Sequence, residues 1–219
     1  MSFLDEFQRH SWESMGERIY AKREPDVVRA LHKQGRRDLD DFCALISPAA
    51  ESHLEEMAQL SFRLTRKRFG NTTQLYIPLY LSNECHNICT YCGFSVDNKM
   101  PRLTLSRDQL MQEVAQIKAQ GFEHILLVTG EAKHRVGVDY FEQVLAWIRP
   151  HFASITMEVQ ALEQADYERL IRRGLNSVLL YQETYNSSTY KSYHPKGRKS
   201  NMAYRDRKST RLNSSHVSQ

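Results

Sequence analysis

The sequence lacks a long apolar run. No window approaches the roughly 18 consecutive apolar residues that would indicate a membrane-spanning helix. The first residues, Met1-Ser2-Phe3-Leu4-Asp5-Glu6, also lack the basic region followed by an apolar one that marks a secretion signal. Both absences argue against a membrane or secreted protein, and we expect a cytoplasmic location. The 219 residues, of which 41% are hydrophobic, are enough for one sizeable core.

Most of the chain also lacks an excess of positive charge. The formal net charge is +4, but residues 191–219 hold eight Lys or Arg against one acid, so this segment carries +7 and the rest of the chain −3. No basic stripe is interleaved with aromatic residues. A nucleic-acid partner is therefore not expected.

Cysteine is scarce. The chain has four cysteines, and three of them, Cys85, Cys89 and Cys92, fall within eight residues directly after a strand-like stretch at 75–81. Three thiolates on one short loop can bind three corners of an iron–sulfur cube, whereas a cluster held by protein alone takes four cysteines. The spacing therefore indicates a 4Fe-4S cluster whose fourth iron is open to a ligand that is not protein.

Other uses of these cysteines stay open. A zinc site would need a fourth ligand, for which His86 is available, although no second Cys or His pair occurs at a recognisable spacing. A closed cluster would make the chain a non-enzymatic metal-binding or electron-transfer module. A disulfide would leave one of the three cysteines over and suits an oxidising compartment. The fourth cysteine, Cys43, lies in the run Phe42-Cys43-Ala44-Leu45-Ile46 and is interpreted as a small buried residue.

Residues 1–72 are predicted to form a helical N-terminal extension. One helix opens at Glu24-Pro25-Asp26, where proline and acidic residues suit a first turn. A longer helix is expected from Ser47-Pro48 to a stop at Gly70. No catalytic motif occurs in this region.

From residue 73 onward, short apolar strands alternate with amphipathic helices. We predict strands at 75–81, 124–129, 154–160 and 177–182. The helices between them run from a capping box at Ser106-Arg107-Asp108-Gln109 to Gly121, over 140–148, and over 164–173. Four βα units require a parallel sheet covered by helices, so the fold class is α/β.

Polar residues stand at the carboxyl ends of these strands, where ligands bind in parallel α/β folds. They are the cysteine loop, Thr129-Gly130-Glu131, Glu158-Val159-Gln160 and Gln182-Glu183-Thr184. Because side chains alternate along a strand, Glu158 and Gln160 are expected to point the same way, into the mouth of the sheet. The sequence therefore predicts one binding rim built from four segments.

The spacing C-x-x-x-C-x-aromatic-C after an apolar strand resembles the signature of the radical S-adenosylmethionine superfamily. Further stretches extend the match, at 76–83 through 92–94, 126–131, 181–185 and 193–197. Within the superfamily, the chain is similar to the 2-iminoacetate synthases, the tyrosine lyases of thiamine biosynthesis. The resemblance covers the chain from its N-terminus to about Arg205.

The resemblance implies that residues 73–205 are the N-terminal part of a TIM-type (βα) barrel, with about four βα units present. Members of the family continue for well over a hundred further residues. Residues 206–219 match none of that part and contain two apolar side chains. Such a composition cannot bury enough surface to become ordered. We expect a disordered, non-native tail on a truncated chain that is inactive alone.

The resemblance also implies the cofactors and their ligands. Cys85, Cys89 and Cys92 would bind the 4Fe-4S cluster, and S-adenosyl-L-methionine would bind its open iron. Thr129-Gly130-Glu131 corresponds to a Gly-Gly-Glu motif that receives the methionyl ammonium group. The predicted cofactor-binding residues are Tyr91, Phe94, Thr129, Gly130, Glu131, Glu158, Gln160, Gln182, Glu183, Thr184 and Arg205. Whether Glu158, Gln182 and Glu183 contact the cofactor or the substrate stays open.

The implied reaction is cleavage of the Cα–Cβ bond of L-tyrosine to 2-iminoacetate and p-cresol. The implied partners are a flavodoxin or ferredoxin reductant and thiazole synthase. A related tyrosine lyase of hydrogenase maturation shares the cysteine loop and the Gln-Glu-Thr region, and it is the nearest alternative.

Overall fold

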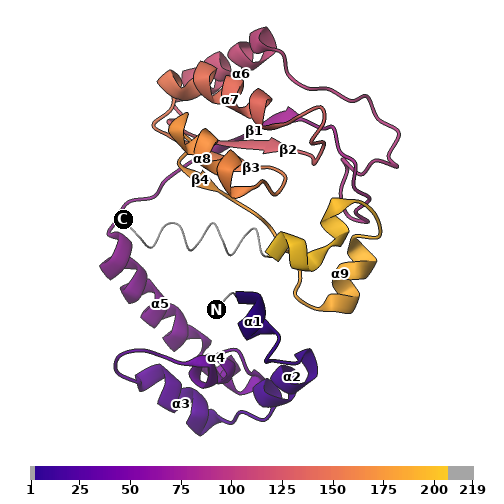
Figure 1. Cartoon of the computed structure of the whole chain (residues 1–219). Helices are drawn as coiled ribbons and strands as arrows, with labels where there is room; N and C mark the ends of the chain where they lie inside the picture. Colours follow the sequence, from indigo (N-terminus) through magenta and orange to yellow (C-terminus); the bar gives the residue numbers. More distant parts are fainter. Residues whose placement is uncertain (1–2, 207–219) are drawn as a thin grey trace. The chain divides into compact units, whose positions relative to one another are not determined.

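The computed structural model describes residues 3–206 (Figure 1). They divide into two compact units: Asp5–Thr73, and Gln74 onward together with the first residues up to Leu4. Each unit has its own buried apolar cluster. Asp206, the first residue of the segment expected to be disordered, is buried. The rest of that segment, residues 207–219, lies outside the described part of the chain.

The N-terminal unit consists of helices. They are α1 (Phe3–Phe7), α2 (Trp12–Tyr20), α3 (Glu24–His32), α4 (Leu39–Leu45), the 3-10 helix η1 (Pro48–His53) and α5 (Leu54–Phe69). Val27, Leu31 and Ala50 form its buried centre. Cys43 is fully buried on α4, which confirms its interpretation as a small core residue.

The helix expected to begin at Ser47-Pro48 has two parts. Its first six residues form η1, and the α-helical hydrogen bonding of α5 begins only at Leu54. Gly70, with a φ of 68°, ends α5 as predicted. Because α5 has no buried residue, its expected apolar side is only partly packed: Met57 contacts the core of the unit, whereas Leu64 is exposed.

The second unit is a parallel α/β layer. Its strands are β1 (Ile77–Ser82), β2 (His124–Thr129), β3 (Ser154–Glu158) and β4 (Ser177–Val178), hydrogen-bonded in the order β1-β2-β3-β4. Its helices are α6 (Arg107–Ala119), α7 (Val138–Ile148), the 3-10 helix η2 (Arg149–His151), α8 (Gln164–Arg172), α9 (Ser187–Tyr193) and the 3-10 helix η3 (Arg198–Ser200). The predicted α/β class and sequential parallel topology are confirmed.

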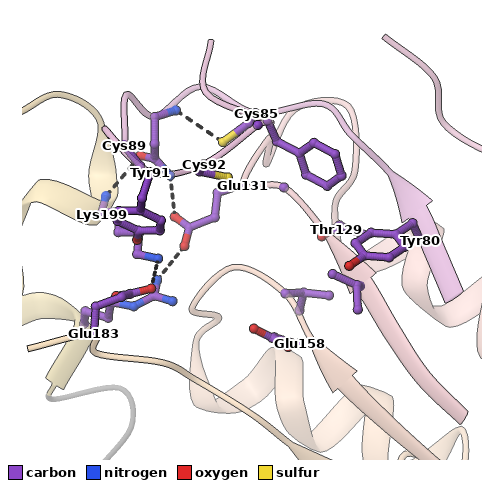
Figure 2. Close-up of a pocket in the computed structure, with 17 residues that line it drawn as sticks. Tyr80, Cys85, Cys89, Tyr91, Cys92, Thr129, Glu131, Glu158, Glu183 and Lys199 are labelled. Atoms are coloured by element: carbon purple, nitrogen blue, oxygen red, sulfur yellow. Dashed lines mark hydrogen bonds and ion pairs between the residues drawn. The ribbon is translucent and has the colours of Figure 1, made fainter. Parts of the chain in front are cut away.

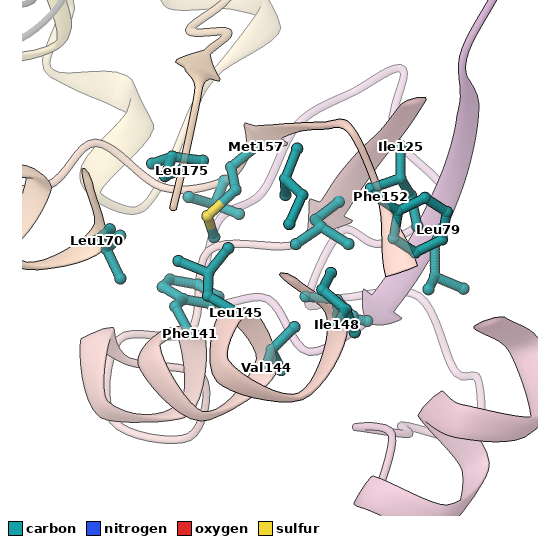
Figure 3. Close-up of a cluster of buried hydrophobic side chains, with 14 of the residues drawn as sticks. Leu79, Ile125, Phe141, Val144, Leu145, Ile148, Phe152, Met157, Leu170 and Leu175 are labelled. Carbon is teal, nitrogen blue, oxygen red and sulfur yellow. The ribbon is translucent and has the colours of Figure 1, made fainter. Parts of the chain in front are cut away.

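The core of this unit lies between the sheet and helices α6, α7 and α8 (Figure 3). Alternate residues of the strands, such as Ile125, Leu127 and Met157, face the helices, where Phe141 and Leu145 of α7 are fully buried. The residues between them, Val128 and Glu158 among them, face the other side of the sheet and line the cavity described below. The period-2 pattern thus separates the core face from the ligand face.

Three strand predictions differ from the structure. β1 covers residues 77–82 rather than 75–81, because its pairing with β2 begins at Ile77. β3 ends at Glu158 rather than at residue 160, and β4 contains two paired residues rather than the six predicted. Within residues 3–206, β4 pairs with β3 alone, so no ladder on its other side extends it. In the same range, no helix combines the length and the apolar character needed to cross a membrane.

Candidate active site

A cavity of about 450 Å³ opens at the carboxyl ends of the first three strands. Its volume lies within the range that small-molecule sites usually have. The lining residues are Tyr80, Cys85, Asn87, Cys89, Tyr91, Cys92, Gly93, Phe94, Val128, Thr129, Gly130, Glu131, Glu158, Val159, Glu183, Lys199 and Arg205. Three of the four segments predicted to form the binding rim therefore reach it through at least two residues each, and the fourth reaches it through Glu183.

The cysteine loop forms one wall of this cavity (Figure 2). Cys85 and Cys89 are buried, Cys92 is partly exposed, and all three are free thiols. Burial raises the pKa of the Cys89 thiol to about 11. A thiol in this environment becomes a thiolate only when a cation replaces the proton, and iron supplies that charge in a cluster. The donor set therefore fits a metal cluster better than a free nucleophile.

The arrangement also bears on the zinc alternative. Within residues 3–206, no three His, Cys, Asp or Glu side chains lie close enough together to bind a single ion. In an iron–sulfur cube each thiolate binds a different iron, so the three thiolates stand around the cluster rather than on one point. Cys85, Cys89 and Cys92 all line this one cavity, as the ligands of a single cluster must.

Gly130 allows the loops after β1 and β2 to pack against each other. A Cβ atom at this position would stand 2.9 Å from the Cβ of Cys85 and closer still to the backbone oxygen of Glu84. Glu131, the next residue, also supports the cysteine loop, because its backbone oxygen accepts a hydrogen bond from the amide of His86 at 3.0 Å. The glycine of the Thr-Gly-Glu motif is therefore needed for backbone approach.

We expect Gly130→Ala to lower the free energy of unfolding by about 1–3 kcal/mol, because the new methyl group displaces the cysteine loop. Gly93→Ala is the matched control, since a Cβ there meets nothing within 4 Å. Urea denaturation of both variants measures the difference. Equal stability of the two would contradict the close packing of these loops.

The carboxylate of Glu131 is held on both oxygens (Figure 2). Asn87 Nδ2 donates to Oε2 at 3.0 Å, and the guanidinium of Arg205 pairs with Oε1. Arg205 also donates from Nε to the backbone oxygen of Tyr181. Both charged side chains are largely buried, with 15% of Glu131 and 7% of Arg205 exposed. An anion and a cation side by side in a cavity are complementary to the ammonium and carboxylate of an α-amino acid group.

Lys199 and Glu183 form a second ion pair that lines the same cavity. Lys199 Nζ contacts Glu183 Oε1 at 2.6 Å and lies 5.6 Å from the centre of the Tyr91 ring. Lys199 lowers the pKa of Glu183, although burial opposes that shift. Within the described residues, Glu183 is the only non-glycine residue with a positive φ, 36°. Strained backbone of this kind persists where surrounding contacts hold it, often at functional sites.

Glu158 stands apart on the opposite wall (Figure 2). No hydrogen bond or ion pair to another described residue satisfies its carboxylate, and burial raises its pKa. A partly buried carboxylate without a partner is destabilising unless a ligand satisfies it. Glu158 is therefore available to a bound molecule.

We expect Glu158→Gln to raise the free energy of unfolding at pH 7 and to lose that advantage near pH 4. The pKa of Glu158 is raised in the folded protein, so above the unfolded value of about 4.3 the folded state binds more protons, and stability falls as pH rises. Glu142→Gln is the control and should instead lower the free energy of unfolding at pH 7. Arg169 lowers the pKa of the Glu142 carboxyl, so that carboxylate stabilises the folded state. Urea midpoints at pH 4 and pH 7 measure both, and a Glu158→Gln advantage that does not grow with pH would contradict the assignment.

Three predicted residues do not line this cavity. Gln160 is buried, and its Nε2 donates to the backbone oxygen of Val136 at 2.8 Å. The expectation that it points the same way as Glu158 is wrong, because β3 ends at Glu158 and the alternation ends with it. Gln182 donates to the backbone oxygen of Met202, and the hydroxyl of Thr184 accepts from the amide of Asn186. The side chains of Gln182 and Thr184 thus form hydrogen bonds within the segment that follows β4.

The other predicted residues lie together. Tyr91, Phe94, Thr129, Gly130, Glu131, Glu158, Glu183 and Arg205 all line the cavity with the three cysteines. The ring of Phe94 packs edge-on against Tyr80 at 5.8 Å. Their roles toward a cofactor stay predictions.

The sequence interpretation missed Asn87, Lys199 and Tyr80. Asn87 lies inside the cysteine loop, and its burial was the missing information. Lys199 was counted with the basic segment at 191–219, yet it belongs to the site, as Arg205 does. That basic charge is therefore partly a property of the cavity. A positive residue close to a Tyr-His-Pro-Lys-Gly motif was the available signal.

The sequence pattern of the radical SAM superfamily matches residues 79–207, and the chain belongs to this superfamily. The match includes the cysteine loop and the Thr-Gly-Glu turn, which confirms the predicted resemblance.

Comparison with individual proteins shows which members of the superfamily the chain is similar to. The chain is 47% identical over 204 residues to 2-iminoacetate synthase of Escherichia coli (strain K12), covering 93% of this chain and 54% of that protein. It thus spans about half the length of this relative. Among solved structures, it is similar to HydG, a maturase of the FeFe-hydrogenase, with a TM-score of 0.87 and 23% identity over 94% of this chain and 48% of that one. The FeFe-hydrogenase maturase HydG from Carboxydothermus hydrogenoformans gives 0.80 and 27%, over 87% and 45%.

Proposed function

We propose that this chain carries the cofactor site of a radical SAM tyrosine lyase that converts L-tyrosine to 2-iminoacetate and p-cresol for the thiazole moiety of thiamine. The observation that carries the proposal is the convergence of Cys85, Cys89 and Cys92 with Glu131 on one cavity at the strand ends. The 47% identity to a 2-iminoacetate synthase supports the tyrosine part.

The residues would divide the work as follows. The three thiolates would hold a 4Fe-4S cluster with one open iron. Glu131 would accept a hydrogen bond from the methionyl ammonium group of S-adenosyl-L-methionine, and Arg205 would pair with the neighbouring carboxylate of that group. When bound and reduced, these cofactors would supply the radical chemistry needed to take a hydrogen from the amino group of tyrosine.

The opposite wall would hold the substrate. Glu158 lies across the cavity from the cysteine loop and has no protein partner, so it would accept a hydrogen bond from the tyrosine ammonium or from a ribose hydroxyl. Tyr80, Phe94 and Val128 also line the cavity and supply apolar surface, which would exclude water from a reactive intermediate. Holding the substrate nitrogen against the 5' carbon is the chief contribution of the protein.

The same chemistry implies protein partners and a cellular location for this chain. Reduction of the cluster needs an outside electron donor such as a flavodoxin or ferredoxin. The imine product would pass to thiazole synthase. The cysteines must stay reduced to bind iron, which suits the cytoplasm.

The test is anaerobic reconstitution of the 219-residue chain with iron and sulfide, followed by reduction and chromatography. S-adenosylmethionine cleavage to 5'-deoxyadenosine is measured with tyrosine, with phenylalanine and with neither. Cleavage stimulated by tyrosine, with p-cresol formed, would support the whole proposal. Cleavage that tyrosine does not stimulate would retain the cofactor site and reject the tyrosine lyase.

Hydrogenase maturation is a second candidate, favoured by the TM-score of 0.80 at 27% identity to HydG. We place hydrogenase maturation second because the chain is more similar in sequence to 2-iminoacetate synthase, at 47% identity. Adding thiazole synthase and its other substrates to the reaction separates the two, because only the thiamine enzyme is expected to support formation of the thiazole.

A further inference from the structure

Residues 193–199, which we call the clamp segment, run along the cysteine loop. The amide of Ile88 donates to the backbone oxygen of Lys196 at 2.9 Å, and the amide of Thr90 donates to that of Tyr193 at 3.0 Å. Ile88 and Lys196 form an antiparallel bridge. Amides on both sides of Cys89 are therefore satisfied by the clamp segment rather than by the loop itself.

Gly197 brings the two segments into contact. Its φ is 96°, and a Cβ atom there would stand 2.7 Å from the Cα of Asn87. Two residues on, the amide of Lys199 donates to Asn87 Oδ1 at 3.1 Å. Since Asn87 also holds Glu131, the clamp segment is connected to the predicted cofactor ligand as well as to the cysteines.

His194 is the one fully buried side chain of the clamp segment. Its Nδ1 lies 2.9 Å from the backbone oxygen of Tyr190, and its Nε2 lies 2.8 Å from the hydroxyl of Tyr91. A backbone oxygen can only accept, so Nδ1 carries the proton of the neutral ring, and Nε2 accepts from the tyrosine. Burial lowers the pKa of His194, which favours that neutral form.

Tyr91 lies between Cys89 and Cys92, and 51% of its surface is exposed. The ring lines the cavity while its hydroxyl end is held by His194. The ring orientation is thus set by His194, which lies 103 positions away in the sequence and does not line the cavity, together with Glu183 of the cavity wall, which also bonds the Tyr91 hydroxyl.

We propose that His194 is a positioning residue for the cofactor site: through Nε2 it sets the ring of Tyr91, and with the clamp segment it holds the cysteine loop in its binding conformation. This rests on the proposed function, in which the cluster and S-adenosylmethionine occupy the cavity that the Tyr91 ring lines. His194 itself touches no bound group.

Variants of the reconstituted chain test the proposal. Tyr91→Phe and His194→Gln are each expected to weaken S-adenosylmethionine binding about tenfold, as loss of a supporting hydrogen bond typically does. Iron and sulfide content should stay at the wild-type level in Tyr91→Phe. The double variant should bind S-adenosylmethionine no more weakly than the single variant with the larger loss, because both changes break the same hydrogen bond between Tyr91 and His194. Tyr76→Phe, which removes an exposed hydroxyl outside both the cavity and the clamp segment, should bind as wild type.

A measurement without iron keeps the two proposals distinguishable. In the iron-free chain, nitrogen NMR of His194 should show a neutral ring protonated on Nδ1, and Tyr91→Phe should speed amide exchange at Thr90. If the wild-type chain neither loads iron nor binds S-adenosylmethionine, the proposed function fails while these two results still decide the role of His194. Should His194→Gln not fold, Tyr91→Phe and the tautomer remain decisive. A ring protonated on Nε2, additive losses in the double variant, or wild-type binding by Tyr91→Phe would each overturn the proposal.

Discussion

Cys85→Ala, Cys89→Ala and Cys92→Ala are each expected to remove most of the iron bound after reconstitution, and with it any S-adenosylmethionine cleavage that the wild-type chain supports. Each thiolate would bind a different iron of the cube, so no neighbouring cysteine can replace a missing one. The fourth cysteine, Cys43, is buried in the N-terminal unit. Iron and sulfide content, electron paramagnetic resonance of the reduced protein and 5'-deoxyadenosine formation measure the effect.

Cys43→Ala is the matched control and should equal the wild-type chain in iron content and in S-adenosylmethionine cleavage. The folded state of the three loop variants is checked by circular dichroism, since a general loss of structure would also release iron. A loop variant that retains a full cluster would show that the protein binds iron through another set of ligands. Retention of one zinc per chain in place of iron would favour the structural-zinc alternative.

Glu131→Gln is expected to weaken S-adenosylmethionine binding by 10- to 100-fold, roughly the loss of one charge-assisted hydrogen bond of about 1.5–3 kcal/mol. It should also lower the free energy of unfolding by about 3 kcal/mol, because the largely buried guanidinium of Arg205 loses its counter-ion. Isothermal titration calorimetry and urea denaturation measure the two effects separately.

The double variant Glu131→Gln/Arg205→Met separates stability from binding. Replacing both members of a buried ion pair by uncharged groups is often neutral, so most of the lost stability should return. Binding should not return, because neither the ammonium nor the carboxylate of the cofactor would find its partner. Recovery of binding together with stability would mean that the pair is only structural.

Much of the fold followed from local patterns. The capping box at Ser106 forms as predicted, with Gln109 and Ser106 bonded reciprocally, because both partners lie within one helical turn. β2 has the predicted bounds, 124–129, since its apolar run is buried on one face by α7 and flanked by other strands on both edges. β4 was overestimated because its length depends on hydrogen-bonding neighbours that no local pattern reports.

The candidate site divides in the same way. The sequence by itself determined the three cysteines, the Thr-Gly-Glu turn and their position at strand ends, because residue type and spacing carry that chemistry. The structure was needed to show that Lys199 belongs to the cavity, that Arg205 pairs with Glu131 there, and that Gln160 turns away from it. Glu131 and Arg205 are 74 positions apart, and Tyr91 and His194 are 103 apart. Partners at such separations are chosen by the packing of loops beyond the strand ends, where the alternation of side chains no longer constrains direction.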